Sequence, residues 1–319
     1  MSSFYTVQET PKLINLLNTI DNLKAQIETQ RLLQPTLWAT IQEKLRVEWT
    51  YNSNAIEGST LTRGETLFFL QEGLTVEGKP FKDFLDARNH AQAIDYLYQV
   101  IKDERPITPG LIKEINALLL LGVTHTDAVT TTGEKIKKPA TPGKYKQLPN
   151  HVLQADGNIH HYTEVLQVPD EVEKLCQWIG DNLVAQHALI TGAIAHYNLV
   201  RIHPFDDGNG RGARILMNVI LIKTGYPPAI IKNELRRQYL ATLNQADKGE
   251  PEPFLIFIAQ SLIDTQRTML EDMEPRSTTD HPVIKQRYNI IMPRKFITAD
   301  YDATLEITIR LGDVIQPDH

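Results

Sequence analysis

Cysteine is nearly absent from this sequence of 319 residues, which contains only Cys176. One cysteine excludes an internal disulfide and a cysteine-based zinc site. Its place in the helical pattern EVEKLCQWI predicts a core position rather than a nucleophile. An excess of basic residues is also absent, since 33 Lys and Arg face 39 Asp and Glu for a net charge of −6. We therefore expect no nucleic-acid partner, because such partners require a positive field.

Long apolar runs are missing as well. No stretch approaches the roughly 18 residues that span a bilayer, so we expect no membrane partner. The first residues, MSSFYTVQETPKL, lack the basic start and apolar centre of a signal peptide, which predicts a cytoplasmic location. Hydrophobic residues at 41% and charged residues at 23% are typical of a packed globular chain of at most two units.

Helical periodicity dominates what is present. Residues 12–50 predict two helices with breaks near LLQPT and YNSN. A further helix is predicted to begin at Thr62, which has capping-box spacing to Glu65, and another at the pair Thr108-Pro109. The predicted fold class is therefore all-α, or mostly helical.

Two stretches depart from the helical pattern. Residues 122–161 are rich in Thr, Lys, Gly and Pro with short β-branched pieces, which predicts a loop or hairpin insertion. Near the C-terminus, LEITIRL at 305–311 alternates apolar and polar residues, which predicts a strand.

The segment HPFDDGNGRGAR, residues 203–214, concentrates several chemistries. Its Gly-Asn-Gly turn enters a helix, where backbone N–H groups and the helix dipole favour a phosphate. Arg211 and Arg214 are three residues apart and can grip successive phosphate oxygens from one face. Asp207 offers the hard oxygen that Mg²⁺ prefers. His203, redirected by Pro204, suits proton abstraction with a pKa near neutrality.

Each of these features alone has a plainer interpretation. A Gly-x-Gly turn before a helix is more often a surface turn, paired arginines are usually a solvated face, and one histidine before proline is usually structural. Together they favour a nucleotide site, and Phe205 between its polar neighbours predicts an anchor of the loop in the core.

HPFDDGNGRGAR resembles the signature of the Fic family, His-Pro-Phe-x-(Asp/Glu)-Gly-Asn-Gly-Arg-x-x-Arg, at every defined position. The resemblance implies a helical core that transfers AMP from Mg-ATP to a protein hydroxyl. Relatives that transfer phosphate alone depart at the second glycine and the first arginine, so AMP transfer is favoured. By this resemblance His203 is the base and Asp207 holds Mg²⁺. The implied nucleotide-binding residues are Asp207, Gly208, Asn209, Gly210, Arg211, Gly212, Ala213, Arg214 and Tyr239.

Tyr239 receives its place beside adenine from the same resemblance, and its alternative interpretation is a helix core position. Nothing else in the chain predicts a nucleotide site as well. PGKYKQ contains Gly143-Lys144 but lacks the preceding glycine and the following Ser or Thr of a P-loop.

A second segment, NSNAIEGSTLT at residues 52–62, predicts a short helix that ends at Glu57. Asn54 to Glu57 also has capping-box spacing, which is the alternative. Ser53 to Gly58 resembles the inhibitory helix Ser/Thr-x-x-x-Glu-(Gly/Asn) of some Fic relatives. By that resemblance, Glu57 in the inhibitory helix 53–58 pairs with Arg214 and occupies the place of the γ-phosphate.

Residues 122–161 are similar to the Fic flap, whose segment 143–152 is expected to dock a target protein. GKYK, residues 143–146, departs from the more usual Gly-x-Tyr-Arg at Lys146. The adjacent His160 and His161 are expected in a solvated loop, because they lack the spacing of a metal site.

The resemblance covers roughly residues 40–265. It divides the chain into an N-terminal helical region (1–100), a Fic core domain (101–270) and an extension of unknown role (271–319). Two rival functions stay open, namely removal of AMP with Glu57 aligning a water, and a regulatory module that binds nucleotide without turnover. An intact His203 argues against the regulatory module, which has no need of a base. Formation of a homodimer is a separate hypothesis.

Overall fold

The computed structural model describes residues 3–33, 35–129, 135–150, 152–153 and 159–274. In chain order the first elements are η1 (Ser3–Tyr5), α1 (Pro11–Leu33), α2 (Pro35–Ile56), α3 (Arg63–Glu72), α4 (Phe81–Lys102) and α5 (Pro109–Leu119). The middle elements are β1 (His125–Val129), β2 (Lys135–Pro139), β3 (Val152–Leu153), β4 (Ile159–His160), η2 (Val165–Gln167) and α6 (Val168–Asn182). The last are α7 (Ala188–Ile202), α8 (Asn209–Lys223), η3 (Asn233–Leu235), α9 (Arg236–Asp247) and α10 (Glu252–Met273). The predicted mostly helical fold class is confirmed.

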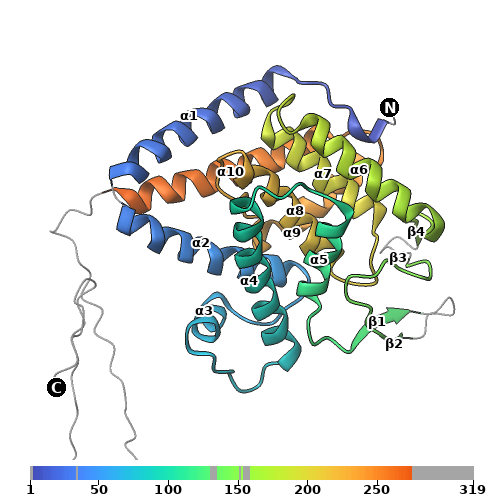
Figure 1. Cartoon of the computed structure of the whole chain (residues 1–319). Coiled ribbons are helices and arrows are strands. Elements are labelled where there is room, and N and C mark those ends of the chain that lie inside the picture. The colour runs from blue at the N-terminus through green and yellow to red at the C-terminus, as the bar shows by residue number, and fades with distance from the viewer. Residues whose placement is uncertain (1–2, 34, 130–134, 151, 154–158, 275–319) are drawn as a thin grey trace, which may run out of the picture. The chain divides into compact units, whose positions relative to one another are not determined.

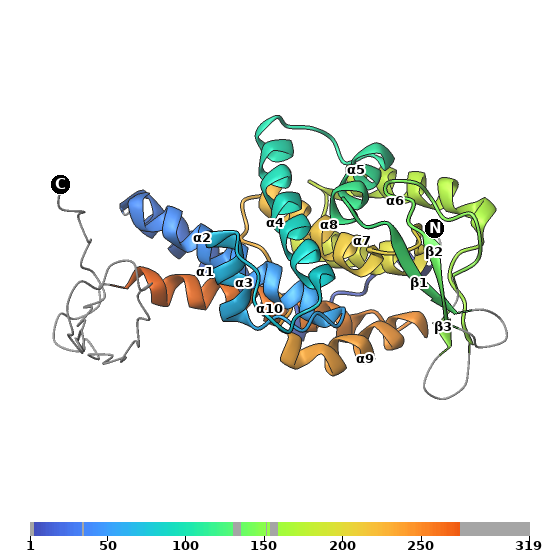
Figure 2. The same cartoon turned by 90° about the horizontal axis from the view of Figure 1, so that it is seen from below.

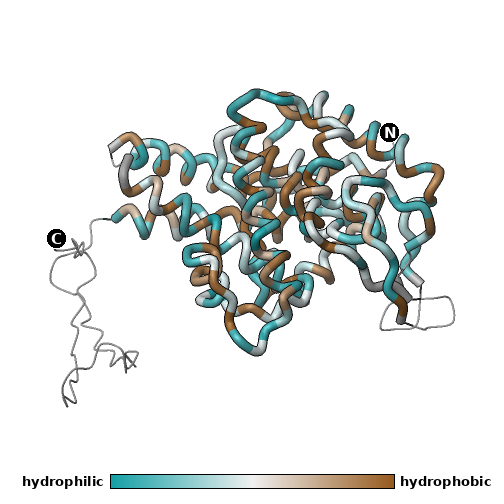
Figure 3. The backbone as a smooth tube through the Cα atoms, turned by 60° about the horizontal axis from the view of Figure 1, so that its bottom comes forward, coloured by the Kyte–Doolittle hydropathy of each residue, from teal (hydrophilic) through white to brown (hydrophobic). Residues whose placement is uncertain are grey.

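Helix α7 is the centre of the fold. Nearly all of its residues are buried, and it packs chiefly against α8, with α6 and α10 on other sides. The long helices α1 and α10 lie side by side, and α2 packs along α4 (Figure 1). Teal and brown alternate along these helices in Figure 3, as expected for helices with one apolar face. Cys176 on α6 lies in the core, as predicted.

Local capping chemistry determines where two of the helices begin. Thr62 Oγ1 accepts from Glu65 N (3.2 Å), and the Glu65 carboxylate accepts from Thr62 N (2.7 Å), which completes the predicted capping box of α3. Thr108 Oγ1 accepts from Leu111 N (3.2 Å) at the start of α5. Both helix starts were predictable because the capping residues are neighbours in the sequence.

The predicted break at YNSN is wrong, because α2 continues through Ile56. Asn52 Nδ2 donates to Glu48 O (2.9 Å) and Asn54 Nδ2 donates to Thr50 O (3.0 Å). These asparagines therefore bond within the helix instead of ending it or capping a new one. Glu57 follows the last turn of a long helix, not a short one.

The insertion after α5 forms two antiparallel pairs. Strands β1 and β2 pair with His125 opposite Pro139, and β3 and β4 pair with Val152 opposite His160. Figure 2 shows them together at one side of the helical body. The predicted hairpin character is confirmed for the described part of this insertion.

Residues Met1–Met273 form one compact unit. The strand predicted at 305–311 lies outside the described residues, as does nearly all of the extension 271–319. The domain boundary near residue 100 stays a prediction. None of the helices in the described ranges has the length and apolar character needed to cross a membrane.

Candidate active site

The loop between α7 and α8 carries the predicted phosphate motif. His203 caps the C-terminus of α7 with φ of 50°, and its N–H donates to Leu199 O (3.0 Å). Gly208 is the N-cap of α8 with φ of 78°, a conformation that glycine adopts without a steric penalty. Because α8 begins at Asn209, the N–H groups of its first turn lack acceptors within the helix and lie at its positive end.

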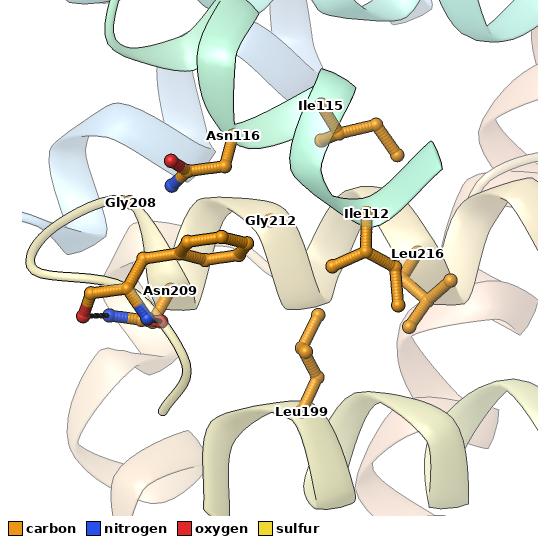
Figure 4. Close-up of a pocket in the computed structure, with 9 residues that line it drawn as sticks. Ile112, Ile115, Asn116, Leu199, Gly208, Asn209, Gly212 and Leu216 are labelled. Carbon is orange, nitrogen blue, oxygen red and sulfur yellow. Dashed lines mark hydrogen bonds between the residues drawn. The ribbon is translucent and has the colours of Figure 1, made fainter. Parts of the chain in front are cut away.

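The side chain of Asn209 holds this loop in shape. Its Oδ1 accepts from Phe205 N (2.9 Å) and its Nδ2 donates to Phe205 O (2.8 Å). Phe205 is buried beside a small apolar pocket between α5, α7 and α8, as the anchor prediction required (Figure 4). Because the side-chain amide of Asn209 bonds within the loop, its backbone N–H is the group that remains for the predicted contact with phosphate.

Asn116 on α5 links this loop to the flap and was not predicted. Its Nδ2 donates to Asp207 O (2.9 Å), and its Oδ1 accepts from Gly143 N (2.9 Å). The side chain is buried, and Figure 4 shows it above Gly208. An asparagine on the apolar side of the pattern LIKEINALLLL is the signal that could have identified it.

His203 is partly buried, and its ring lies under Tyr162 with the two ring centroids 3.7 Å apart and an interplanar angle of 20°. Burial, reinforced by the nearby charge of Lys146, lowers the pKa of His203 to about 3. The predicted pKa near neutrality is therefore wrong, because the loop removes the imidazole from water. The ring is neutral at pH 7, and contact of Nδ1 with Val200 O (3.4 Å) leaves Nε2 as the proton acceptor.

Arg211 is buried between two carboxylates. Its Nη1 lies 2.8 Å from Asp86 Oδ1, and its Nη2 lies 3.4 Å from Asp207 Oδ1. Asp86 comes from α4, far away in the sequence, and was not predicted. The plainer interpretation of the two arginines as a solvated face is wrong, because both guanidinium groups are buried and paired. Their predicted grip on phosphate oxygens stays a prediction.

Arg214 receives its partners from the end of α2. Its Nε donates to Ser53 Oγ (2.9 Å), and its Nη2 donates to Ser53 O (2.8 Å) and to Glu57 Oε1 (2.7 Å). The expected pair of Glu57 with Arg214 is therefore present. A methyl group on Gly210 would lie 2.3 Å from Glu57 Oε1, so the carboxylate rests against the first turn of α8. Glu57 thus occupies the anion-binding end of that helix.

The charge of Glu57 is stabilised where it lies. Desolvation raises the pKa of this carboxyl, but Arg214, Arg211 and Arg236 lower it by more, so the pKa lies below its usual range. Arg236 Nε also donates to Ile56 O (2.6 Å), which satisfies a carbonyl at the end of α2. Several elements therefore hold Glu57 in this position.

Three other predicted nucleotide-binding residues, Gly212, Ala213 and Tyr239, are buried. Gly212 and Ala213 are buried on the inner face of α8, and Gly212 lines the apolar pocket of Figure 4. Tyr239 is 2% exposed, and its hydroxyl lies 2.9 Å from His196 Nε2. Its alternative interpretation as a core residue fits this geometry, and the contact with adenine stays a prediction.

Comparison with known proteins agrees with the motif. Residues 106–221 match the family model described as Fic/DOC family. The chain contains a Fic domain. Over 243 residues, it is 34% identical to the protein adenylyltransferase Fic of Nematostella vectensis, covering 74% of this chain and 50% of that protein. It is 30% identical over 251 residues to the protein adenylyltransferase fic-1 of Caenorhabditis briggsae, covering 77% and 45% respectively.

The solved structure of a Fic domain containing signaling protein from Bacteroides thetaiotaomicron is also similar. Its TM-score is 0.71 at 29% identity, covering 80% of this chain and 96% of that one. The chain spans about half the length of the curated relatives it matches.

The flap of this Fic domain places Lys146 inside the protein. Lys146 N donates to Pro204 O (2.8 Å), and its Nζ donates to Asn150 Oδ1 (2.8 Å), with the residue 1% exposed. Burial lowers the pKa of Lys146 to about 8. His160, expected to be solvated, is instead partly buried, with its Nδ1 3.9 Å from Asp247 Oδ2. His161 is exposed, as expected.

Asp207 is the side chain predicted to hold Mg²⁺. Asp207 is 35% exposed, and its Oδ1 accepts from Gly208 N (2.6 Å). Across the described residues, no group of three or more His, Cys, Asp or Glu side chains is arranged to hold a metal. This fits Mg²⁺, which commonly takes one or two carboxylates and completes its shell with phosphate oxygens and water.

Proposed function

We propose that this protein is a self-inhibited protein adenylyltransferase, which transfers AMP from Mg-ATP to a Ser, Thr or Tyr hydroxyl of a target protein. The curated relatives named as protein adenylyltransferases support the reaction class. The contact of Glu57 with Arg214 at the start of α8 is the observation that carries the proposal. An internal carboxylate occupies a position whose backbone N–H groups and arginine suit the phosphates of a nucleotide.

The chemistry follows from the loop and α8. The backbone N–H groups of Asn209 and Gly210 and the guanidinium of Arg214 bind phosphate oxygens. Asp207 holds Mg²⁺, which neutralises phosphate charge when bound. His203 Nε2 takes the proton of the target hydroxyl, whose oxygen then attacks the α-phosphorus, and the bond to pyrophosphate breaks.

Inhibition follows from the same contacts. While Glu57 holds Arg214, the terminal phosphate of ATP lacks its cationic partner. ATP then binds with its α-phosphate out of line with the attacking oxygen, and misalignment of this kind lowers the rate strongly. Release of α2 from Arg214 is the activating event.

The target protein docks on the flap segment 143–152 by this proposal. Lys146 does not contact it, because its amine is buried against Asn150. Exposed flap residues remain available, among them Leu148 at 66% exposure. The homodimer hypothesis is independent of this proposal, and a monomer in light scattering at micromolar concentration would exclude it.

The test is incubation with Mg²⁺ and ATP labelled at the α-phosphate, with label on protein as the readout. We compare wild type, Glu57→Gly, the double variant Glu57→Gly/His203→Ala, and Glu72→Gly as a matched control at an exposed position of α3. Labelling by Glu57→Gly alone supports the proposal. If none labels although all bind ATP, AMP transfer is refuted; removal of AMP from a modified protein by wild type would then identify the hydrolytic alternative.

A further inference from the structure

Tyr162, just after β4, covers the ring of His203. The two rings are nearly parallel, with an interplanar angle of 20° and centroids 3.7 Å apart. The ring of His160 meets Tyr162 edge-on at 4.7 Å and 70°. The imidazole of His203 is therefore packed on one face by an aromatic ring that is itself supported from the flap.

The flap is tied to both residues that follow His203. Lys146 N donates to Pro204 O (2.8 Å), and Asn150 Nδ2 donates to Phe205 O (2.8 Å). Lys146 Nζ also lies 5.9 Å from the centroid of Tyr162, within cation–π range. These contacts hold the flap against the loop, so the position of the Tyr162 ring on His203 is fixed by its surroundings.

His203 has little else to fix its ring plane. Its backbone is in the left-handed region, and its Nδ1 reaches Val200 O only at 3.4 Å, at the long limit of a hydrogen bond. Without the stack, the imidazole could rotate about its side-chain torsions, and Nε2 would then leave the line to the acceptor hydroxyl.

We propose that Tyr162 is a positioning residue for His203, whose ring stack keeps the imidazole oriented and shielded from water. This inference rests on the proposed function only for the role of His203 as the base. The phenol ring, not the hydroxyl, performs this task, so Tyr162→Phe is the conservative variant and Tyr162→Ala the disruptive one.

The first test is an NMR titration of the full chain with ¹⁵N-labelled histidine, in which His203→Ala identifies the signal. Lys146, Glu57 and His160 are the titratable groups that act on this imidazole, together with the Val200 carbonyl, and they are unchanged in all variants. We expect Tyr162→Ala to raise the pKa of His203 toward its ordinary value of 6.5, because water reaches the ring. Tyr162→Phe and the control Tyr98→Ala on α4 should leave it unchanged. An unchanged titration in Tyr162→Ala overturns the proposal.

The second test measures transfer of label in the Glu57→Gly background at saturating ATP. We expect Tyr162→Ala to lower kcat by roughly tenfold or more, since the base is misplaced, with KM for ATP unchanged. Tyr162→Phe should retain the rate. Loss of labelling in Tyr162→Phe would show that the hydroxyl is required and would overturn the positioning role of the ring. If Glu57→Gly does not label but the NMR shift is observed, the proposed function fails and the positioning role stands.

Discussion

The contact between Glu57 and Arg214 predicts how tightly the protein binds ATP. Charge-assisted hydrogen bonds contribute roughly 1.5–3 kcal/mol. The Glu57 side chain is 42% exposed, so screening by water reduces this contribution to about 1–2 kcal/mol. By the proposed function, ATP must break the contact before its terminal phosphate reaches Arg214. We therefore expect Glu57→Ala to raise the affinity for ATP about five- to thirtyfold.

Isothermal titration calorimetry with a non-hydrolysable ATP analogue measures this change, and Glu72→Ala controls for the loss of one negative charge. Glu57→Gln should give an intermediate affinity, because its amide oxygen still accepts from Arg214 without the charge. ADP should gain less affinity than ATP from Glu57→Ala, because it lacks the terminal phosphate that the proposal assigns to Arg214, although its phosphates also bind at the start of α8 beside Glu57. Equal gains for ADP and ATP, or no gain for ATP, would refute the argument.

Three further variants test other contacts. Lys146→Met should stabilise the fold by about 1–3 kcal/mol at pH 7, after allowing for one lost hydrogen bond. Burial lowers the pKa of Lys146 from 10.5 to about 8, so the wild type gains stability as pH rises between these values. The urea midpoints of wild type and Lys146→Met should therefore lie closer together at pH 9.5 than at pH 7. Arg236→Ala removes the partner of Ile56 O at the end of α2 and should give weak labelling in otherwise wild-type protein. The control Arg237→Ala, at the exposed neighbouring position, should give no labelling. Phe205→Ala should lower the free energy of unfolding by about 3–5 kcal/mol, measured by urea denaturation, because Phe205 is 3% exposed in the core.

The parts of the fold that the sequence predicted correctly depend on neighbouring residues. The start of α3 follows from Thr62 and Glu65, and the start of α5 from Thr108 and Pro109, since each cap is made within four positions. The motif at residues 203–214 is equally local, because a turn and one helix hold its residues together.

The errors concern contacts between distant segments. Asn52 and Asn54 are typical of helix breaks, yet both donate to carbonyls one turn earlier in α2. Asn52 Oδ1 also accepts from Asn233 N (2.9 Å), 181 positions away, a contact that the sequence does not reveal. Asp86 and Tyr162 reach the site from α4 and the flap, and no local pattern marks either residue. The low pKa of His203 has the same origin, because burial is set by the packing of segments that the sequence does not show to be neighbours.

A last prediction concerns acid. A carboxyl whose folded pKa is lowered stabilises its contact above its unfolded pKa and loses that contribution as pH falls through the folded value. The pKa of Glu57 is lowered, so the contact with Arg214 persists at pH 5.5 as at pH 7.5. His203, with a pKa of about 3, also stays neutral over this range. The labelling rate of wild type relative to Glu57→Gln, the mimic of a protonated Glu57, should therefore be the same at both pH values. A wild-type rate that rises in acid to match Glu57→Gln would show that protonation opens the site; a constant ratio requires activation through movement of α2.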